Sequence, residues 1–365
     1  MTKKRKIAFL INSLSSGGAE RVVTTLANSL VHTYDVHIIT FINIPPFYDL
    51  DRRVKIINCF NKIDPSSNPL QALKSNYSLL RRIHGIIKEN KIELLIGFMT
   101  TANVLATVIG KINSIPVIIS ERNNPEKQNL SKFWEISRKF TYRYADYLVV
   151  QTPIIKNYFI NTVDENRLKV LPNPISSQLS SLRKRTCENE NIILNVGSLT
   201  NQKAQHVLIE SFAKINTPSW KLIIVGDGPR RKELTILIEQ LNLVENILLV
   251  GQQKNIHEYY NKAKIFAFSS TYEGFPNALI EAMHFGLPCV STDCPTGPAE
   301  LIQDGQNGFL VPINDIKEMS FKLGSLMANP AKIKGFGEKG VLSVQQYEEK
   351  NVIKQWNKII NTLIG

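Results

Sequence analysis

Residues 268–283 read Phe-Ser-Ser-Thr-Tyr-Glu-Gly-Phe-Pro-Asn-Ala-Leu-Ile-Glu-Ala-Met. This stretch follows the apolar run of a strand, passes through a loop with glycine and proline, and continues in a helical pattern. Asn277 is a favourable N-cap, so we expect Glu273 to precede the helix and Glu281 to lie about one turn inside it. Free N–H groups at the start of a helix bind anions, and carboxylates accept hydrogen bonds from hydroxyl groups. The stretch therefore predicts a strand–loop–helix unit that binds a diphosphate flanked by hydroxyl groups, as in a nucleotide sugar.

The same alternation of short apolar runs and helical patterns extends along the whole chain. In the first half, we expect strands at 6–12, 36–41, 94–98, 116–120 and 147–151, and helices near 19–31, 70–90, 103–113, 132–144 and 153–160. In the second half, we expect strands at 192–196, 221–225, 247–250, 265–269 and 288–291, and closing helices at 313–327, 330–347 and 352–363. Strand–helix repetition is typical of doubly wound parallel sheets, which bind ligands at the carboxyl ends of their strands.

A polar stretch without periodicity divides the two series of elements. We therefore expect an α/β domain over residues 1–172, a linker over 173–190 and a second α/β domain over 191–346. The remaining residues, 347–365, are expected to form a C-terminal helix that can pack back on the first domain. The two domains are expected to face each other across a central cleft.

The composition is that of a globular protein rather than a disordered or coiled-coil chain, with 43 % hydrophobic and 21 % charged residues among 365. No apolar run approaches the roughly 18 residues that a membrane-spanning helix needs. The basic and apolar start imitates a signal peptide, but Asn12 interrupts it and no small-residue cleavage site follows. The four cysteines are too few for a disulfide framework, and with six scattered histidines they predict no metal site. These features favour a cytoplasmic location.

The positive charge is concentrated in the first half of the chain. Residues 1–175 hold 24 Lys and Arg against 13 Asp and Glu, a net charge of +11 out of the total of +13. Such a surface suits phospholipid headgroups, a pyrophosphate or nucleic acid, although solubility alone is an equal explanation. The segments 70–91 and 132–143 interleave basic with apolar and aromatic residues at helical spacing. They are expected either to dock on the inner face of the cytoplasmic membrane or to pack an ordinary core.

Three glycine-containing loops follow expected strands. Gly17 and Gly18 permit a positive φ and a close approach of backbone N–H groups to an anion. Gly197 and Ser198 lead to Lys203, which can neutralise a diphosphate or be an ordinary solvated lysine. The turn from Gly226 through Gly228 to Arg230 and Arg231 can border a nucleotide site or be a simple Asp-Gly turn.

Taken together, these motifs resemble the retaining glycosyltransferases of family 4, whose GT-B fold has two Rossmann-like domains. The resemblance rests on Glu273 and Glu281, separated by seven residues, and on the motifs that match in order: 17–21, 196–203, 226–229, 286–288 and Pro172-Asn173-Pro174. It covers essentially the whole chain. It implies a hexosyltransferase that moves a hexose or N-acetylhexosamine from a nucleotide sugar to a lipid-linked glycan in bacterial surface-polysaccharide assembly. A UDP-sugar is the first expectation for the donor and GDP-mannose the second.

The resemblance also implies roles for single residues. Lys203 and Glu273 would be catalytic, with Lys203 at the diphosphate and Glu273 at the donor sugar, while Glu281 would hold the ribose. The other implied donor-binding residues are Gly17, Gly18, Gly197, Ser198, Gly228, Arg230, Gly274, Phe275, Pro276, Asn277, Ala278 and Leu279. The implied acceptor-binding residues are Glu121, Arg122 and Asn123. No cofactor or metal is expected, because the nucleotide sugar is a co-substrate and cationic side chains can neutralise its phosphates.

The chain departs from the family pattern at two positions. Ser198 stands where family members commonly carry arginine, so stabilisation of the leaving group would rest on Lys203, the helix N-terminus and Arg230 or Arg231. Arg122 stands where the family often shows histidine.

Two other functions are compatible with parts of the sequence. A GT-B-type UDP-sugar 2-epimerase would share the architecture and the donor, but the paired glutamates disfavour it. A basic nucleic-acid-binding protein would explain only the charge, because the chain has no recognisable nucleic-acid-binding motif.

Overall fold

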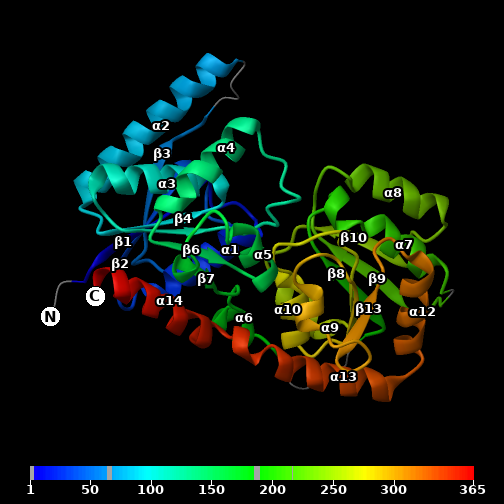
Figure 1. The fold of residues 1–365 in the computed structure, drawn as a ribbon. Helices are drawn as coiled ribbons and strands as arrows, with labels where there is room; N and C mark the ends of the chain where they lie inside the picture. The colour runs from blue at the N-terminus through cyan, green and yellow to red at the C-terminus, as the bar shows by residue number, and fades with distance from the viewer. Residues whose placement is uncertain (1–3, 64–67, 185–189, 216) are drawn as a thin grey trace. The chain divides into compact units, whose positions relative to one another are not determined.

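The computed structural model describes residues 4–63, 68–184, 190–215 and 217–365, and it contains two compact units (Figure 1). The first unit comprises Met1–Pro174 and Glu349–Gly365, and the second comprises Ile175–Glu348. The expected linker over 173–190 therefore needs correction, because the second unit already begins at Ile175. Ile175 is buried in the core of that unit, and helix α6 (Ser177–Ser181) follows. Residues 185–189 of the expected linker lie outside the described residues.

The first unit is built on a parallel sheet of seven strands in the order β3-β2-β1-β4-β5-β6-β7. Its strands are β1 (Lys6–Ile11), β2 (Asp35–Ile42), β3 (Lys55–Phe60), β4 (Leu94–Phe98), β5 (Val117–Ser120), β6 (Tyr147–Val150) and β7 (Leu168–Val170). The strand order changes direction between β1 and β4, which are parallel neighbours with Ile7 of β1 opposite Leu94 of β4. Central strands such as β4 are buried along their whole length, because helices cover both faces of the sheet.

Two sets of helices cover the first sheet. The apolar sides of α1 (Gly18–Leu30) and α14 (Glu349–Ile364) pack on one face, and Trp356 of α14 is fully buried there (Figure 1). The other face packs against α2 (Pro69–Asn90), α3 (Thr100–Asn113), α4 (Lys132–Thr141) and α5 (Pro153–Phe159). Ser29 and Tyr34 donate hydrogen bonds to Glu349 and Asn361. The C-terminal helix is thus an integral part of the first unit.

The second unit repeats the design with six parallel strands in the order β10-β9-β8-β11-β12-β13. The strands are β8 (Ile192–Val196), β9 (Lys221–Val225), β10 (Ile247–Gly251), β11 (Ile265–Phe268), β12 (Cys289–Thr292) and β13 (Gly308–Val311). The helices are α7 (Gln205–Ala213), α8 (Arg231–Gln240), α9 (Ile256–Lys262), α10 (Asn277–His284), α11 (Pro298–Leu301), α12 (Ile316–Met327) and α13 (Pro330–Ser343). Here the strand order changes direction between β8 and β11, which are parallel neighbours and pair through Ile193 and Ile265.

This architecture confirms the expected pair of doubly wound parallel sheets. The sequence patterns did not predict β3, β7 and β13, and all three are edge strands. Within the described residues, no helix combines the length and the apolar character needed to cross a bilayer.

Candidate active site

The loops that follow β8 and β11 lie next to each other at the point where the strand order of the second sheet changes direction. Ligands of doubly wound sheets bind at such a point, in the crevice outside the carboxyl ends of the strands. The backbone N–H of Thr271 donates to the carbonyl of Gln202 (2.8 Å), and the side-chain amide of Gln202 donates to the carbonyl of Tyr272 (2.8 Å). The hydroxyl of Ser269 donates to the carbonyl of Lys203 (2.7 Å). These hydrogen bonds hold the two loops together as one rigid surface.

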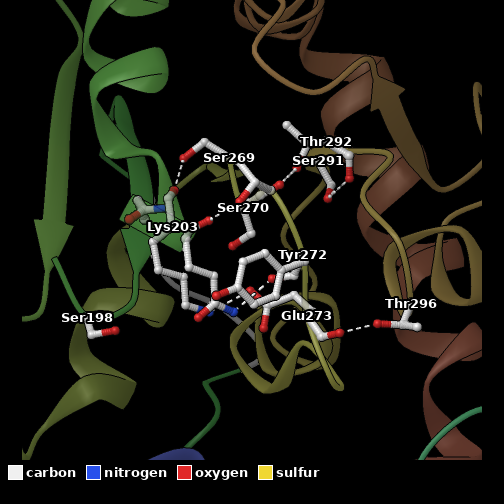
Figure 2. Close-up of polar contacts among 12 residues, drawn as sticks. Ser198, Lys203, Ser269, Ser270, Tyr272, Glu273, Ser291, Thr292 and Thr296 are labelled. Atoms are coloured by element: carbon white, nitrogen blue, oxygen red, sulfur yellow. Dashed lines mark hydrogen bonds and ion pairs between the residues drawn. The ribbon is translucent and has the colours of Figure 1, made fainter. Parts of the chain in front are cut away.

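Lys203 and Glu273, the two expected catalytic residues, form an ion pair across these loops. Lys203 Nζ lies 2.6 Å from Glu273 Oε1, and the two side chains are 18 % and 7 % exposed (Figure 2). Lys203 Nζ also lies 5.1 Å from the centre of the Phe268 ring. The aliphatic stem of Lys203 packs against Gly197, where a Cβ would be in van der Waals contact with it at 3.4 Å. The pair is thus a partly desolvated, preformed arrangement of one cation and one anion.

The segment 292–297 supports Glu273 from behind. Thr292 Oγ1 donates to the carbonyl of Ser270 (2.5 Å), and Thr296 Oγ1 donates to the carbonyl of Glu273 (Figure 2). Gly297 adopts a φ of +103°, and a Cβ there would lie 2.4 Å from Cδ of Pro276. The sequence patterns did not predict these contacts to the Glu273 loop. The turn-rich run 293–298, Asp-Cys-Pro-Thr-Gly-Pro, was the one sign of an ordered loop in this segment.

The start of α10 differs from the expectation in one respect. The helix begins at Asn277 itself and Pro276 is the N-cap, so the expected Asn277 cap is wrong. The amides of Asn277 and Leu279 donate to the carbonyls of Phe275 and Pro276, which removes two of the expected anion-binding donors. The amides of Gly274, Phe275 and Ala278 have no backbone acceptor within the described residues. The N-terminus of α10 therefore offers a smaller set of donors than its sequence suggests.

Glu281 lies inside α10 and is buried. The hydroxyl of Tyr260 donates to Glu281 Oε2 (3.1 Å), and the ring of Tyr260 packs against Phe285 with centroids 5.1 Å apart. Glu281 is thus anchored inside the second unit by Tyr260, whereas Glu273 pairs with Lys203.

The 226–228 turn supports the Gly197 loop through close backbone contact. Gly226 has a φ of +144°, and a Cβ there would lie 1.9 Å from the carbonyl oxygen of Gly197. A Cβ at Gly228 would lie 2.5 Å from the carbonyl oxygen of Leu199, and the amide of Leu199 donates to the carbonyl of Asp227 (3.0 Å). The two glycines are thus required by the packing of one loop on the other.

Both arginines of this turn have partners within the second unit, and their implied role at the leaving group stays a prediction. Arg230 Nε donates to Glu233 (2.8 Å), and Arg230 Nη1 contacts His206 Nδ1 (3.0 Å). The hydrogen bond with Glu233 raises the pKa of Arg230, and the same bond lowers the pKa of Glu233. Arg231 Nη2 donates to the carbonyl of Leu249 (2.9 Å). Ser198 lies apart from the Lys203–Glu273 pair (Figure 2). Lys203 is therefore the cation that the described part of the second unit places beside Glu273.

In the first unit, the Gly17-Gly18 loop opens α1, and Gly17 is its N-cap. The φ of Gly17 is −116°, so this glycine does not use the positive φ that its residue type permits. The Glu20 side chain folds back over Gly17, and a Cβ at Gly17 would lie 1.9 Å from Glu20 Oε2, so a larger residue there would displace this carboxyl group. Burial raises the pKa of Glu20. The start of α1 is thus already covered by a carboxyl group of the chain.

The three expected acceptor-binding residues follow β5 and have different environments. Glu121 is fully buried and accepts hydrogen bonds from Thr100 Oγ1 (3.0 Å) and the Tyr142 hydroxyl (2.5 Å). Burial raises the pKa of Glu121. Arg122 is buried as well, and Asn123 is half-buried. Glu121 is therefore buried among its partners, and the acceptor-binding role implied for these three residues stays a prediction.

No group of three or more His, Cys, Asp or Glu side chains that could hold a metal ion occurs in the residues that the structure covers.

Comparisons with known proteins agree with this architecture. The sequence model of Glycosyltransferase Family 4 matches residues 16–179, and that of Glycosyl transferases group 1 matches residues 181–341. The chain is 30 % identical to the GalNAc-α-(1→4)-GalNAc-α-(1→3)-diNAcBac-PP-undecaprenol α-1,4-N-acetyl-D-galactosaminyltransferase of Campylobacter jejuni, over 97 % of this chain and 98 % of that protein. It is 29 % identical to the amylovoran biosynthesis glycosyltransferase AmsD of Erwinia amylovora, over 98 % and 99 % of the two chains.

Among solved structures, HepE of Anabaena in complex with UDP has the same fold. Its TM-score is 0.79 at 21 % sequence identity, and the match covers 98 % of this chain and 100 % of that chain. The family models, the relatives matched over nearly their whole length and the two parallel sheets agree with one another. The chain is therefore a glycosyltransferase of family 4 with the GT-B fold.

Proposed function

We propose that the enzyme transfers a hexose or N-acetylhexosamine from a UDP-sugar to a lipid-linked glycan, with retention of configuration, at the inner face of the cytoplasmic membrane. The observation that carries this proposal is the Lys203–Glu273 ion pair beside the start of α10. The donor's diphosphate would take Lys203 as its counterion, and hydroxyl groups of the donor sugar would donate hydrogen bonds to Glu273. On donor binding, Lys203 would thus contact the diphosphate instead of Glu273, and Glu273 would contact sugar hydroxyl groups instead of Lys203.

The proposed reaction breaks the bond between the anomeric carbon and the β-phosphate oxygen, and it forms a bond from the same carbon to an acceptor hydroxyl oxygen. The acceptor hydroxyl gives its proton to the departing phosphate on the same face of the sugar, so the configuration is retained and no carboxylate nucleophile is needed. Negative charge develops on the leaving diphosphate. Preorganised cations and N–H dipoles stabilise such charge, and this is usually the largest catalytic contribution. Lys203 and the free amides near Gly274 and Ala278 are the groups positioned for this role.

Two named proteins support the choice of substrates. The name of the Campylobacter relative specifies an undecaprenol-diphosphate-linked glycan as acceptor, and the Anabaena protein was crystallised with UDP. We extend both features to this chain as substrates, and we propose that the reaction needs no metal ion, because Lys203 supplies the positive charge at the phosphates.

The location rests on an exposed apolar surface of the first unit. Leu70, Leu73 and Tyr77 on α2 are 60–74 % exposed, and Phe133, Ile136 and Phe140 on α4 are 52–58 % exposed. We call these six residues the α2/α4 surface. Both helices pack on the same face of the sheet (Figure 1). The C-terminal part of α2 is different, because Ile83, Ile86 and Ile87 are buried, so the core-packing explanation holds there.

Basic side chains accompany the α2/α4 surface. The exposed ones on α2 are Lys74, Arg81, Arg82 and Lys88, and those on or just after α4 are Lys132, Lys139 and Arg143. Exposed apolar residues flanked by cations bind membranes that carry anionic lipids. We therefore propose an anionic lipid surface as the partner of this face.

The first experiment tests the reaction. Wild-type protein is incubated with a panel of UDP-hexoses, UDP-N-acetylhexosamines and GDP-mannose, and with an undecaprenol-diphosphate glycan, in the presence of EDTA. We expect transfer from one UDP-sugar, undiminished by EDTA, and an α-linked product from an α-linked donor by NMR. Release of a 2-epimer without transfer would favour the epimerase, although the relatives named above are transferases.

The second experiment tests the location by flotation with vesicles. We expect binding to anionic vesicles at low salt, and a loss of at least fivefold in Phe133→Ser/Phe140→Ser. The matched control is Phe321→Ser, which removes an equally exposed aromatic residue from α12 of the second unit and should leave binding unchanged. Equal flotation of all three proteins would contradict the proposed surface. A salt-dependent gel shift with nucleic acid in place of flotation would assign the basic charge to nucleic acid.

A further inference from the structure

Arg122 is a buried arginine that lies at the carboxyl end of β5 in the first unit. It is 5 % exposed, and its guanidinium carbon lies 4.7 Å from the ring centre of Phe98 and 5.9 Å from that of Trp356. Arg122 Nη1 donates to Asn173 Oδ1 (2.5 Å). A strand end, the C-terminal helix and the end of the first unit's main segment therefore fix the plane of the guanidinium.

The other edge of this guanidinium has no partner. Arg122 Nε and Nη2 are both buried and make no hydrogen bond within the described residues. The neighbouring Glu121 does not serve as a counterion by direct contact, because Thr100 and Tyr142 donate to its carboxylate. Burial lowers the pKa of Arg122 to about 9. A buried N–H group without an acceptor is costly, so the unpaired Nε and Nη2 groups distinguish Arg122 from an ordinary core arginine.

The comparison with Arg138 shows that the missing partner is specific to Arg122. Arg138 is also 5 % exposed in the first unit, but its Nη2 donates to the Tyr158 hydroxyl (3.0 Å) and its Nη1 donates to Gln128 Oε1 (3.3 Å). Its ring contacts with Tyr158 and Phe159 are similar to those of Arg122. Burial and aromatic stacking alone therefore do not leave a guanidinium edge unpaired in this unit.

The free edge has the geometry of a bidentate anion site. The Nε–H and Nη2–H groups of arginine point in parallel from one side of the guanidinium, and they match two oxygens of a phosphate or carboxylate. We propose that Arg122 binds two oxygens of a phosphate group of a diphosphate-bearing substrate through this edge, and this rests on the proposed function for the identity of the substrate. The nucleotide donor and the lipid-linked acceptor share this chemistry. The stacking rings and Asn173 position the edge for it.

The test measures the two sources of phosphate separately. Transfer is assayed with wild type, Arg122→Gln and Arg122→Lys, using a lipid-diphosphate glycan and the same glycan on a neutral alkyl group, and UDP release without acceptor is assayed in parallel. If the acceptor phosphate binds, Arg122→Gln raises KM tenfold or more for the diphosphate acceptor and leaves KM for the neutral acceptor unchanged. If the donor phosphate binds, the tenfold rise appears in KM for the UDP-sugar in both assays. Arg122→Lys restores part of the affinity in either case, because it keeps the charge and loses the fork.

Arg138→Gln is the matched control, since it removes an equally buried arginine with partners of its own. It should lower Tm and leave both KM values within twofold of wild type. If Arg122→Gln behaves in the same way, with a lower Tm and unchanged KM values, the proposal is overturned and Arg122 is a structural group between two rings.

A binding experiment separates this proposal from the proposed function. Inorganic pyrophosphate is titrated by calorimetry into Lys203→Met and into Lys203→Met/Arg122→Gln, so that the site at Lys203 is disabled in both proteins. Binding that disappears with Arg122→Gln supports the anion site even if wild type transfers no sugar from any donor tested. Identical titrations of the two variants would refute it, even in an active glycosyltransferase.

Discussion

Replacing both members of the Lys203–Glu273 pair should restore stability without restoring activity. In Lys203→Met, the Glu273 carboxylate, only 7 % exposed, loses a cation 2.6 Å away. Breaking a buried ion pair from one side costs about 3–5 kcal/mol, and the 18 % exposure of Lys203 places this pair near the lower value. For a unit of this size, about 3 kcal/mol corresponds to a fall in Tm of roughly 6–12 °C. Glu273→Gln should cost a similar amount, because it strands the lysine.

The double variant Lys203→Met/Glu273→Gln has no stranded charge. We expect it to be about 2–3 kcal/mol more stable than the sum of the single effects predicts, which a double-mutant cycle of urea unfolding measures directly. Activity should follow a different pattern. Loss of one preorganised group at a developing negative charge lowers kcat by about 10²–10³, so each single variant and the double variant should all transfer sugar at least 100-fold more slowly.

Two results would refute this reasoning. Recovery of kcat in the double variant would mean that the pair matters only for folding. Additive stability effects would mean that Lys203 and Glu273 are not in contact in solution. Ser270→Ala is a suitable control, because it removes a hydroxyl of the same loop and leaves the carbonyl that accepts from Thr292 in place.

Three further predictions concern stability. Gly226→Ala should lower the free energy of unfolding by at least about 2 kcal/mol in urea titrations, because of its φ of +144° and the 1.9 Å approach to Gly197, whereas Gly335→Ala, in an open position of α13, should raise it by about 0.5–1 kcal/mol. The raised pKa of Glu121 means that its contribution to stability is fully present below the ordinary glutamate pKa of 4.5 and is lost as pH rises through the folded-state pKa. Glu121→Gln cannot ionise, so its Tm should gain on that of wild type between pH 5 and pH 8, and a constant difference would contradict the raised pKa. Trp356→Ala should cost about 3–5 kcal/mol and loosen α14, which limited proteolysis would detect, because the indole is fully buried against Phe98.

The parts of the fold that sequence predicted well are the central strands. A strand in a parallel sheet that is covered on both faces must be apolar along its whole length, as in Leu94–Phe98 and Ile265–Phe268. Edge strands escape this requirement. Lys55–Phe60 is half-exposed and carries lysine and asparagine, and Leu168–Val170 has only three residues. Their pairing is determined by a neighbouring strand and leaves little trace in their own sequence.

The candidate site was predictable to the level of loops but not of side-chain pairs. Lys203 and Glu273 could be assigned to one site because both follow strands that the topology places side by side. Their direct contact depends on the packing of segments 70 residues apart, which sequence patterns do not reveal. The pairing of Arg230 with Glu233 is local, because the two residues are three positions apart on the chain. Residue propensity also placed the N-cap of α10 one residue too late. The helix begins at Asn277, and Pro276, whose ring fixes φ, is the N-cap.

The two cations singled out here would respond to an anion in opposite ways. A phosphate that approaches Lys203 must take the lysine from Glu273, and a ligand without hydroxyl groups leaves that carboxylate buried and unpaired. Only a ligand that brings both a diphosphate and hydroxyl groups compensates both sides of the exchange, which favours an intact nucleotide sugar over free phosphate. Arg122 has no carboxylate partner to lose, so a phosphate there gains two hydrogen bonds without stranding another group. In this proposal, discrimination for the whole donor would arise at Lys203, whereas Arg122 would recognise the phosphate group itself, whatever it is attached to.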